Sequence, residues 1–517
     1  MENFETASEN MKLRNNIPMN SIAEDRGNEH DLAKELLSEL EKLERKMLEV
    51  VKSHRHVIDQ LDKGQQASCI NLLFYLALRS EDIRELQNKL HIFGLSSLAS
   101  SESHVYSQMN AILQRLGKVN HQVENLFYRY EDAVKDIRRK SQILFGSKKE
   151  MTVPFIMVTL DSGYTEDYDK IMELLLTGMN VARINCAHDD EPVWASLIGH
   201  IKRAKQETGL DCKIYMDLAG PKLRTVFHGK KHGKHKIEVS EGERIYLSDD
   251  KISDGEKIVG CTIRGIVPQL RVGERVLFDD GSIECKVNKC TADGAELIVL
   301  RISREKPYIK SEKGINLPDS KLSLSSITDF DKECLPFICQ NADLVGYSFV
   351  RTSHDLERLQ NMMKTLSAKE PCIVIKIETQ EAVENLPALI IQGMQERAFG
   401  VMIARGDLAI EVGFERLSEI QEEILWICEA AHVPVIWATQ VLDTLNKSGL
   451  ATRSEITDAA YSGRAECVMI NKGEHTIEVI ESLKDILLRH GGHHIKKRYT
   501  FRPLHIAKSF LTSVTQL

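Results

Sequence analysis

Three ionisable residues stand where apolar runs end in the segment from Cys372 to Asp407. Lys376 and Glu378 close the run Cys-Ile-Val-Ile-Lys-Ile-Glu, and Asp407 closes Gly-Val-Met-Ile-Ala-Arg-Gly-Asp. A short apolar run is typical of a strand buried on both faces, and a charge at its end is costly unless a cavity, a metal or an opposite charge receives it. Two interpretations are open: a buried Lys–Glu ion pair, or two carboxylates that hold a divalent ion beside a cation.

The elements that must position these residues form a repeat. Eight apolar runs occur, at Val153–Leu160, Val181–Ala187, Cys212–Leu218, Asp343–Val350, Cys372–Glu378, Gly400–Asp407, Val433–Gln440 and Glu466–Asn471. Amphipathic segments separate most neighbours, namely Tyr168–Gly178, Pro192–Thr208, His354–Ala368, Glu381–Gly393 and Leu417–His432. The repeat predicts an α/β fold, a closed (β/α)8 TIM barrel over residues 151–225 and 318–490, with catalytic groups at the C-terminal strand ends. The polar residues that close the runs are Arg183, Asn185, Asp217, Ser348, Lys376, Glu378, Asp407, Thr439 and Asn471.

One connection, between the third and fourth runs, breaks this repeat. Short alternating runs such as Arg244–Leu247 and Glu296–Leu300 are broken there by Glu-Gly, Val-Gly and Asp-Gly pairs, which predicts short antiparallel strands. We expect residues 226–317 to form a small inserted β-barrel or sandwich, which could close over the site as a lid and exclude water. Asp279-Asp280-Gly281 and Lys313-Gly314 are its expected turn residues, and the sequence alone favours ordinary turn chemistry as the explanation for them.

The two terminal regions lie outside the barrel, and the helical N-terminal region shows no motif that could carry chemistry. Residues 1–30 are polar and aperiodic and are expected to be disordered. Residues 31–150 predict a helical region, with an apolar stripe that begins at Leu32, Leu36, Leu37, Leu40 and Leu43. Structural packing explains this region, and a helix that docks a partner is the alternative. Residues 491–517 form a basic tail, in which Lys496-Lys497-Arg498 is interpreted as solvated rather than as a binding patch.

Composition argues against several classes of protein. The net charge of -8 argues against nucleic acid as a partner. The 11 cysteines show no Cys-x-x-Cys spacing, so neither a zinc site nor a disulfide framework is indicated, and free thiols fit a reducing, intracellular setting. Apolar runs such as Ile70–Leu78 are shorter than the ~20 residues of a membrane helix. Glu2, Glu5 and Glu9 are untypical of a transit peptide, so we expect a cytoplasmic protein, or a plastid protein if a transit peptide is missing from this chain.

Seven stretches carry a resemblance to a known family. They are Gly-Met-Asn-Val-Ala-Arg-Ile-Asn (178–185), Asp-Leu-Ala-Gly-Pro-Lys-Leu-Arg-Thr (217–225), Lys-Gly-Ile-Asn-Leu-Pro (313–318), Lys-Ile-Glu (376–378), Ala-Arg-Gly-Asp-Leu (404–408), Ala-Thr-Gln-Val-Leu (438–442) and Thr-Arg-Ser-Glu-Ile-Thr-Asp (452–458). With these stretches, Val153 to Leu488 resembles the pyruvate kinase family, in its plant and bacterial type. The resemblance implies magnesium-dependent phosphoryl transfer from phosphoenolpyruvate to ADP, giving pyruvate and ATP as the last step of glycolysis.

The resemblance also implies roles for individual residues. Glu378 and Asp407 resemble the ligands of an essential Mg²⁺ or Mn²⁺ ion. Lys376 resembles the cation that stabilises the phosphoryl group and the enolate, and Arg183 an arginine that binds phosphate. Thr439 resembles the residue near which enolpyruvate is protonated. The implied catalytic residues are thus Lys376, Arg183 and Thr439, the substrate-binding set adds Gly406, Asp407 and Ser348, and the nucleotide-binding residues are Asn185, His188, Arg224 and Lys313.

The monovalent-cation site departs from the family pattern. Potassium-requiring members hold the ion with Asn, Ser, Asp and Thr, and the corresponding positions here are Asn185, Ala187, Asp217 and Leu218. Lys222 replaces the usual Glu after Gly-Pro, and Ala219 replaces a Lys. Members that work without K⁺ resemble this pattern, and the ammonium of Lys222 could supply the missing positive charge. The altered site, Asn185, Asp217 and Lys222, therefore predicts activity without K⁺; the loss of the Lys at Ala219 has no explanation.

The C-terminal part departs as well. After Asn471 the sequence continues with one helical stretch, His475–His490, and the basic tail, whereas typical members carry a further α/β domain with a sugar-phosphate regulatory site and part of the tetramer interface. We expect no sugar-phosphate regulation, and the sequence leaves open whether the chain forms a homo-oligomer. The alternative to a working pyruvate kinase is a catalytically weak pyruvate-kinase-like binding or regulatory protein, which Ala187, Leu218 and Ala219 favour. A third interpretation is another enolate enzyme that cleaves or carboxylates a keto acid.

Overall fold

The computed structural model describes residues 19–118, 127–148, 153–227, 236–249, 257–291, 294–303, 308–320, 322, 324–366, 370–491, 494–495 and 498–499. The chain divides into two compact units. Unit 1 comprises Met1–Gln60 and Gln66–Val134, and unit 2 comprises Leu61–Gln65 and Lys135–Leu517. No helix in the described ranges combines the length and the apolar character that crossing a membrane requires.

Unit 1 consists of helices: α2 (Met19–Ser53), α3 (Arg55–Ile58), α4 (Gln66–Arg79), α5 (Arg84–Ile92) and α6 (Val105–Arg115). The predicted stripe on α2 is buried at Leu36, Leu40 and Leu43. Helix α2 begins at Met19, so the expectation of disorder over residues 1–30 is wrong from Met19 onward, and residues 1–18 lie outside the described part. A long helix extends at low cost once its first turns exist, and this extension needs no apolar stripe.

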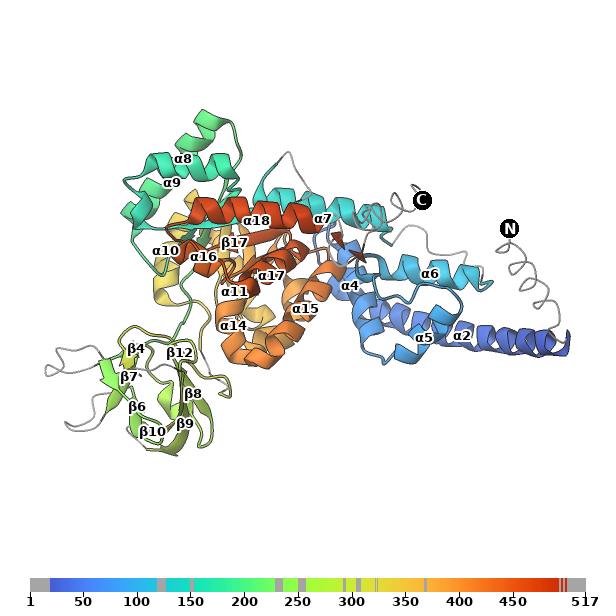
Figure 1. Cartoon of the computed structure of the whole chain (residues 1–517), viewed down its shortest axis with the longest axis horizontal. Coiled ribbons are helices and arrows are strands. Elements are labelled where there is room, and N and C mark those ends of the chain that lie inside the picture. The colour runs from blue at the N-terminus through green and yellow to red at the C-terminus, as the bar shows by residue number, and fades with distance from the viewer. Residues whose placement is uncertain are drawn as a thin grey trace, which may run out of the picture. The chain divides into compact units, whose positions relative to one another are not determined.

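Unit 2 contains the predicted closed barrel of eight parallel strands, in the order β1-β17-β16-β15-β14-β13-β3-β2. The strands are β1 (Phe155–Leu160), β2 (Val181–Asn185), β3 (Lys213–Asp217), β13 (Leu344–Tyr347), β14 (Cys372–Ile377), β15 (Gly400–Ala404), β16 (Val435–Ala438) and β17 (Cys467–Ile470). The covering helices are α8 (Tyr168–Thr177), α9 (Glu191–Thr208), α10 (Asp329–Asn341), α11 (Ser353–Leu366), α12 (Gln380–Glu384), α13 (Leu386–Gly393), α14 (Arg405–Val412), α15 (Phe414–Ala430), α16 (Asp443–Ser448), α17 (Arg453–Tyr461) and α18 (Thr476–Gly491). Figure 1 shows helices such as α8, α11, α15 and α18 around strand β17. The TIM-barrel prediction is confirmed.

The barrel interior is filled by side chains. Met157, Tyr215 and Met402 from the strands belong to one buried cluster, and Leu144 and Phe145 join it from helix α7 (Tyr130–Phe145). All five are almost completely buried. The end of α7 therefore packs into the core formed by the strands. This packing stabilises the strands, and the predicted site residues follow their C-terminal ends.

Two predicted elements end differently in the structure. Strand β15 ends at Ala404, and Arg405 begins α14, so Asp407 lies in the first turn of a helix and not at the end of a strand. A carboxylate in the first turn is favoured by the helix dipole. The single helix expected over Glu381–Gly393 is divided into α12 and α13, because Pro387 stands at the start of a helix, where its missing N–H costs nothing.

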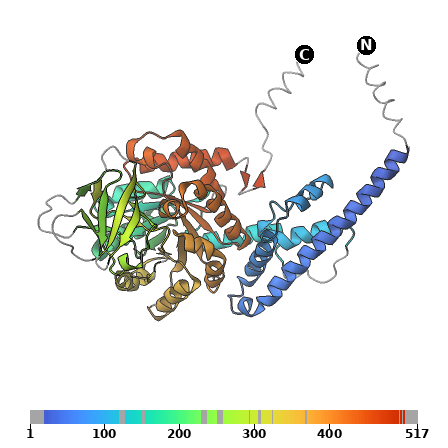
Figure 2. The ribbon, with the colours of Figure 1, turned by 90° about the horizontal axis from the view of Figure 1, so that it is seen from below.

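The inserted region forms a separate β domain within unit 2. Its strands are β4 (Thr225–Val226), β5 (Lys236–Glu238), β6 (Arg244–Ser248), β7 (Ile258–Cys261), β8 (Arg275–Phe278), β9 (Ile283–Cys290), β10 (Ala295–Ile302), β11 (Tyr308–Lys310) and β12 (Ile315–Asn316). Seven form one sheet, β12-β8-β9-β10-β6-β7-β4, and β11 pairs with β5. All these pairings are antiparallel as predicted, except that of β6 with β7. Figure 2 shows the green strands together as one body.

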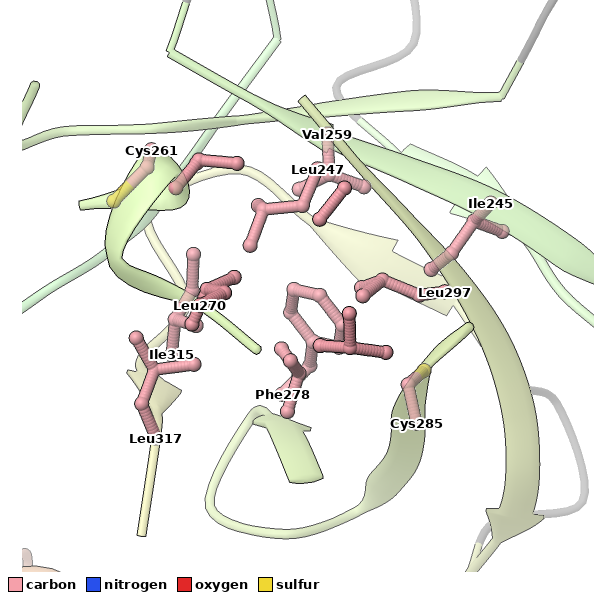
Figure 3. Packing of buried hydrophobic residues seen from close by; sticks show 14 of the residues in the cluster. Ile245, Leu247, Val259, Cys261, Leu270, Phe278, Cys285, Leu297, Ile315 and Leu317 are labelled. Carbon is pink, nitrogen blue, oxygen red and sulfur yellow. The ribbon is translucent and has the colours of Figure 1, made fainter. Parts of the chain in front are cut away.

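The β domain has its own core. Phe278, Leu297 and Ile315 pack in one buried cluster, which Figure 3 shows at close range. Ile309 of β11 belongs to the same cluster, so the two sheets of the domain share a single core. Asp279 and Asp280, predicted as turn residues, have positive φ angles of 50° and 54°, a conformation that Asp adopts more readily than most residues.

Candidate active site

A cavity of about 210 Å³ lies at the C-terminal ends of the barrel strands. Its walls come from residues at or just beyond the ends of β2, β3, β13, β14, β15, β16 and β17. Ten of the residues singled out from the sequence line it: Arg183, Asn185, His188, Lys222, Arg224, Ser348, Lys376, Glu378, Asp407 and Thr439. They meet because the parallel strands of a barrel all end at one rim.

The floor of this cavity is a buried network of opposite charges. The Lys376 ammonium lies 3.2 Å from a Glu378 carboxylate oxygen and 3.7 Å from Asp217, and it donates to the Ser348 hydroxyl at 2.9 Å. Arg183 donates from Nε to Asp217 at 2.7 Å. Asp217 is fully buried and does not line the cavity itself. The first interpretation, a buried Lys376–Glu378 ion pair, is therefore present, and both side chains also line the cavity. The second, a divalent ion held by two carboxylates, stays a prediction.

Burial and charge determine the protonation of these groups. Burial acts to lower the pKa of Lys376, but the carboxylates of Asp217 and Glu378 outweigh it, so the pKa is raised and the ammonium stays charged. Burial acts to raise the pKa of Asp217, but Lys376 and Arg183 outweigh it and lower the pKa. For Glu378, burial raises the pKa, Lys376 opposes the rise, and the charge of Asp407 adds to it. A further cation beside Glu378 and Asp407 would relieve this repulsion.

Two carboxylates at the cavity, Glu378 and Asp407, are the groups suited to a metal. Glu378 accepts a hydrogen bond from the Phe349 N–H at 2.6 Å, and Asp407 accepts from the Lys222 ammonium at 2.7 and 3.0 Å. Carboxylate oxygens suit Mg²⁺ and Mn²⁺, which commonly bind through one or two carboxylates plus water and substrate oxygens. Within the described ranges, no group of three or more His, Cys, Asp or Glu is placed to hold a metal, so Glu378 and Asp407 as metal ligands stay a prediction.

Thr439 stands on a strained piece of backbone at the cavity wall. Its φ angle is 67°, and that of Gln440 is 58°, in a region that β-branched residues rarely adopt. The Thr439 hydroxyl oxygen is buried and has no hydrogen-bond partner among the described residues. Arg405 donates to the Thr439 and Ala438 carbonyl oxygens and so holds this backbone. Strain and an unpaired buried hydroxyl are typical of functional positions.

The remaining candidate residues differ in their placement. Gly406 lies outside the lining of the cavity, and a Cβ built on it would be 3.8 Å from the side chain of Thr439, an ordinary contact distance. Partial burial lowers the pKa of His188, and the charges of Lys472 and Arg224 lower it further. Arg224 donates to the Glu312 carbonyl oxygen, which ties it to the β domain. Lys313 lies outside the lining of the cavity, and its ammonium is 3.2 Å from Asp279 within the β domain.

Comparison with known proteins identifies the family of this chain. The family model for the pyruvate kinase barrel domain matches residues 153–477. The chain belongs to the pyruvate kinase family. A pyruvate kinase from Geobacillus stearothermophilus is 31% identical over 333 residues, which cover 63% of this chain and 55% of that protein. A pyruvate kinase from Thermotoga maritima is 30% identical over 330 residues, or 62% of this chain and 68% of the relative.

These matches to pyruvate kinases cover only part of each protein. The chain spans little more than half the length of the Geobacillus stearothermophilus relative, 55%. The crystal structure of a pyruvate kinase from Cryptosporidium parvum has a TM-score of 0.60 to this structure, with 23% identity over 73% of this chain and 77% of the other. That similarity establishes a shared fold.

Two contacts of this pyruvate kinase family member were not anticipated from the sequence. The first is the pairing of Lys222 with Asp407, although each residue was singled out alone. The second is the set of contacts made by Arg405, which is 6% exposed. Arg405 pairs with Asp458. Its guanidinium carbon also lies over the Trp437 ring, 4.5 Å from the ring centroid. Arg405 and Asp458 both lie in stretches that carry the family resemblance, and this resemblance could have pointed to them as functional residues.

Proposed function

We propose that this chain transfers a phosphoryl group from phosphoenolpyruvate to ADP with a divalent metal ion. The observation that supports the proposal is the convergence of Lys376, Glu378 and Asp407 with Arg183 on one cavity at the strand ends. Phosphoryl transfer mainly requires positioning and neutralisation of charge, and this cavity supplies fixed cations beside two carboxylates.

Each group then has a chemical task. Lys376 and Arg183 face an anionic substrate with charges that are held in place by Asp217, so little reorganisation is needed when the substrate arrives. Glu378 and Asp407 would hold Mg²⁺ or Mn²⁺, which when bound neutralises phosphate oxygens. The backbone at Gly406 would contact the substrate carboxylate. The Thr439 hydroxyl would pass a proton at the wall of the cavity; its lack of a partner among the described residues supports this role.

The β domain contributes to nucleotide binding in this proposal. Arg224 and Thr225 contact the loop that contains Glu312 and Lys313, so the β domain is joined directly to the nucleotide side of the cavity. Closure of the domain as a lid would bring Lys313 towards the ADP phosphates and reduce the access of water. Asn185, His188 and Arg224 would form the remaining nucleotide contacts.

We also propose that K⁺ is not required. Both oxygens of Asp217, which would have to bind the ion, already accept hydrogen bonds, from the Tyr215 hydroxyl at 2.7 Å and from Arg183 at 2.7 Å. Leu218 and Ala187 line the cavity without offering side-chain oxygens. Lys222 lines the same cavity as Leu218 and Ala187, and its positive charge pairs there with Asp407.

A coupled assay tests the proposal. Purified chain with phosphoenolpyruvate, ADP and Mg²⁺ should produce pyruvate at the same rate with K⁺ and with a non-binding organic cation. Lys376→Met should lower the rate by roughly 100- to 1,000-fold, because it removes a preorganised charge from the reaction centre. Lys332→Met, which removes an exposed lysine on α10, is the matched control and should leave the rate unchanged. Strict dependence on K⁺ would contradict the proposal that K⁺ is not required, and would leave the proposed phosphoryl transfer unaffected.

A binding or regulatory protein of the same fold is the second candidate. Its support is that Lys222 takes both oxygens of Asp407 and that Leu218 and Ala219 make part of the wall apolar. Turnover that does not exceed that of Lys376→Met, together with retained binding of phosphoenolpyruvate or ADP by calorimetry, would favour this candidate over the enzyme.

A further inference from the structure

The ammonium of Lys222 contacts both carboxylate oxygens of Asp407, at 2.7 and 3.0 Å. Lys222 lies between β3 and β4, and Asp407 lies in the first turn of α14, so the pair connects two separate parts of the cavity rim. The Lys222 stem also passes close to the β domain, since a Cβ placed on Gly314 would be 3.4 Å from Lys222 Cε. The Lys222 side chain therefore lies beside Gly314 where its ammonium reaches Asp407.

The two carboxylates proposed as metal ligands each have a lysine of their own. Glu378 pairs with Lys376 at 3.2 Å, and Asp407 pairs with Lys222. Two ammonium groups thus balance two carboxylates. A divalent ion that binds both carboxylates adds two positive charges to a neutral group of four, so repulsion favours the departure of one lysine from the site.

Lys222 is the lysine that can leave. Lys376 is 8% exposed and has three partners, Glu378, Ser348 and Asp217. The Lys222 side chain is 26% exposed, and within the described part of the chain its ammonium pairs with Asp407 alone. A long side chain with one partner and access to solvent gives up that partner at a lower cost than a buried side chain with three.

We propose that Lys222 is a built-in competitor of the metal ion: it occupies Asp407 until a divalent ion displaces it. The inference rests on the proposed metal role of Asp407 and deepens it, because it makes metal binding depend on the release of a charged side chain. Metal affinity in the absence of substrate is then weaker than the two carboxylates alone would give. The released ammonium becomes free to contact the phosphate groups of a substrate, so metal and substrate binding support one another.

Direct metal binding tests this competition without any need for turnover. The full chain, free of substrates, is titrated with Mn²⁺, and free Mn²⁺ is measured by electron paramagnetic resonance. Lys222→Met should bind Mn²⁺ at least about tenfold more tightly than the wild type, a coupling of ordinary size for competing ligands. Lys222→Gln removes the same charge and should behave alike, whereas Lys222→Arg keeps a cation and should stay near the wild type.

Two controls locate the effect. Lys472→Met removes a cation that is 57% exposed and pairs with Asp161 at 2.7 Å, so it tests the loss of positive charge in general and should change the affinity by less than about twofold. Asp407→Asn in the Lys222→Met background should abolish the gain, because the carboxylate that was released is then absent.

Three results would overturn the inference. Equal Mn²⁺ affinity of the wild type and both neutral variants would show that Lys222 does not compete with the metal ion. It would not affect the proposed reaction, because the coupled assay tests the reaction separately. An equal gain in Lys472→Met would show a general charge effect. Absence of Mn²⁺ binding in every variant would overturn the competition and the proposed metal ligands together.

Discussion

At the scale of single residues, Arg405 is the group that holds Thr439 in its strained conformation. Its guanidinium donates to the Ala438 carbonyl at 2.9 Å, contacts the Thr439 carbonyl and pairs with Asp458. A planar guanidinium can serve these partners at once, whereas a lysine ammonium is a point charge with a different geometry. Arg405 is therefore a positioning residue for the Thr439 hydroxyl.

Arg405→Lys should lower kcat by roughly 10- to 100-fold and change the KM for phosphoenolpyruvate much less, because it displaces a reacting group without removing a substrate contact. The exchange of pyruvate methyl protons with D₂O, followed by NMR, should fall by a similar factor, since this exchange reports the proton transfer alone. Arg416→Lys on α15, an exposed pair with Glu419, is the control. Wild-type exchange in Arg405→Lys would show that Thr439 is positioned by other groups.

The sequence was sufficient to predict some of these residues and not their pairings. Lys376 and Glu378 were predicted to share a site because both close one buried parallel strand, and such strands end at a common rim. The pairing of Lys222 with Asp407 joins residues that are 185 positions apart and lie in a loop and a helix. No periodicity relates two such positions, so this contact follows only from the three-dimensional path of the loop after β3.

At the scale of elements, α14 connects the site to the β domain through Glu411. Asn316 of β12 donates to the Glu411 carboxylate at 3.4 Å, and a second Asn316 atom, Oδ1, is buried without a hydrogen-bond partner among the described residues. Burial raises the pKa of Glu411 from 4.5 to about 7, Asn316 opposes the rise, and the charge of Asp407 adds to it. A protonated carboxyl could donate to the free amide oxygen of Asn316.

This raised pKa predicts how stability depends on pH. Between pH 4.5 and about 7 the folded chain holds the Glu411 proton and the unfolded chain does not, so the stability contributed by this group is lost as the pH rises through about 7. Glu411→Gln cannot ionise, so it should exceed the wild type by about 1 to 3 kcal/mol in urea unfolding at pH 8.5 and by less at pH 5. Glu415→Gln, exposed on α15, should show no such trend. A difference that is constant with pH would contradict the assignment.

Elements were predicted best where one pattern dominates the local sequence. The eight barrel strands were all identified, because each is buried on both faces and so reads as a short apolar run. The start of α2 at Met19 was not predicted, because the extension of a helix needs no apolar periodicity in the sequence. The helical position of Asp407 was not predicted either, because the change from strand to helix there is abrupt. The proposal that the N-terminal helices bind a partner stays a prediction.

At the scale of the whole molecule, the chain crosses between two units at three points, after Gln60, Gln65 and Val134. Each unit has its own buried core, with Leu40 in unit 1 and Leu144 in unit 2 completely buried. All three tryptophans, Trp194, Trp426 and Trp437, belong to unit 2. Tryptophan fluorescence therefore reports the unfolding of unit 2 alone, whereas far-ultraviolet circular dichroism reports both units.

We expect the two units to unfold in separate steps, because each has a buried core of its own. Leu40→Ala and Leu144→Ala make the same change in the two cores and should each cost about 2 to 5 kcal/mol of the stability of their own unit. In urea, Leu144→Ala should lower the midpoint of the fluorescence transition. Leu40→Ala should leave that midpoint unchanged and shift only a part of the circular dichroism signal. If Leu40→Ala moved the fluorescence midpoint as far as Leu144→Ala does, the helices of unit 1 and the barrel would have to unfold as one cooperative body.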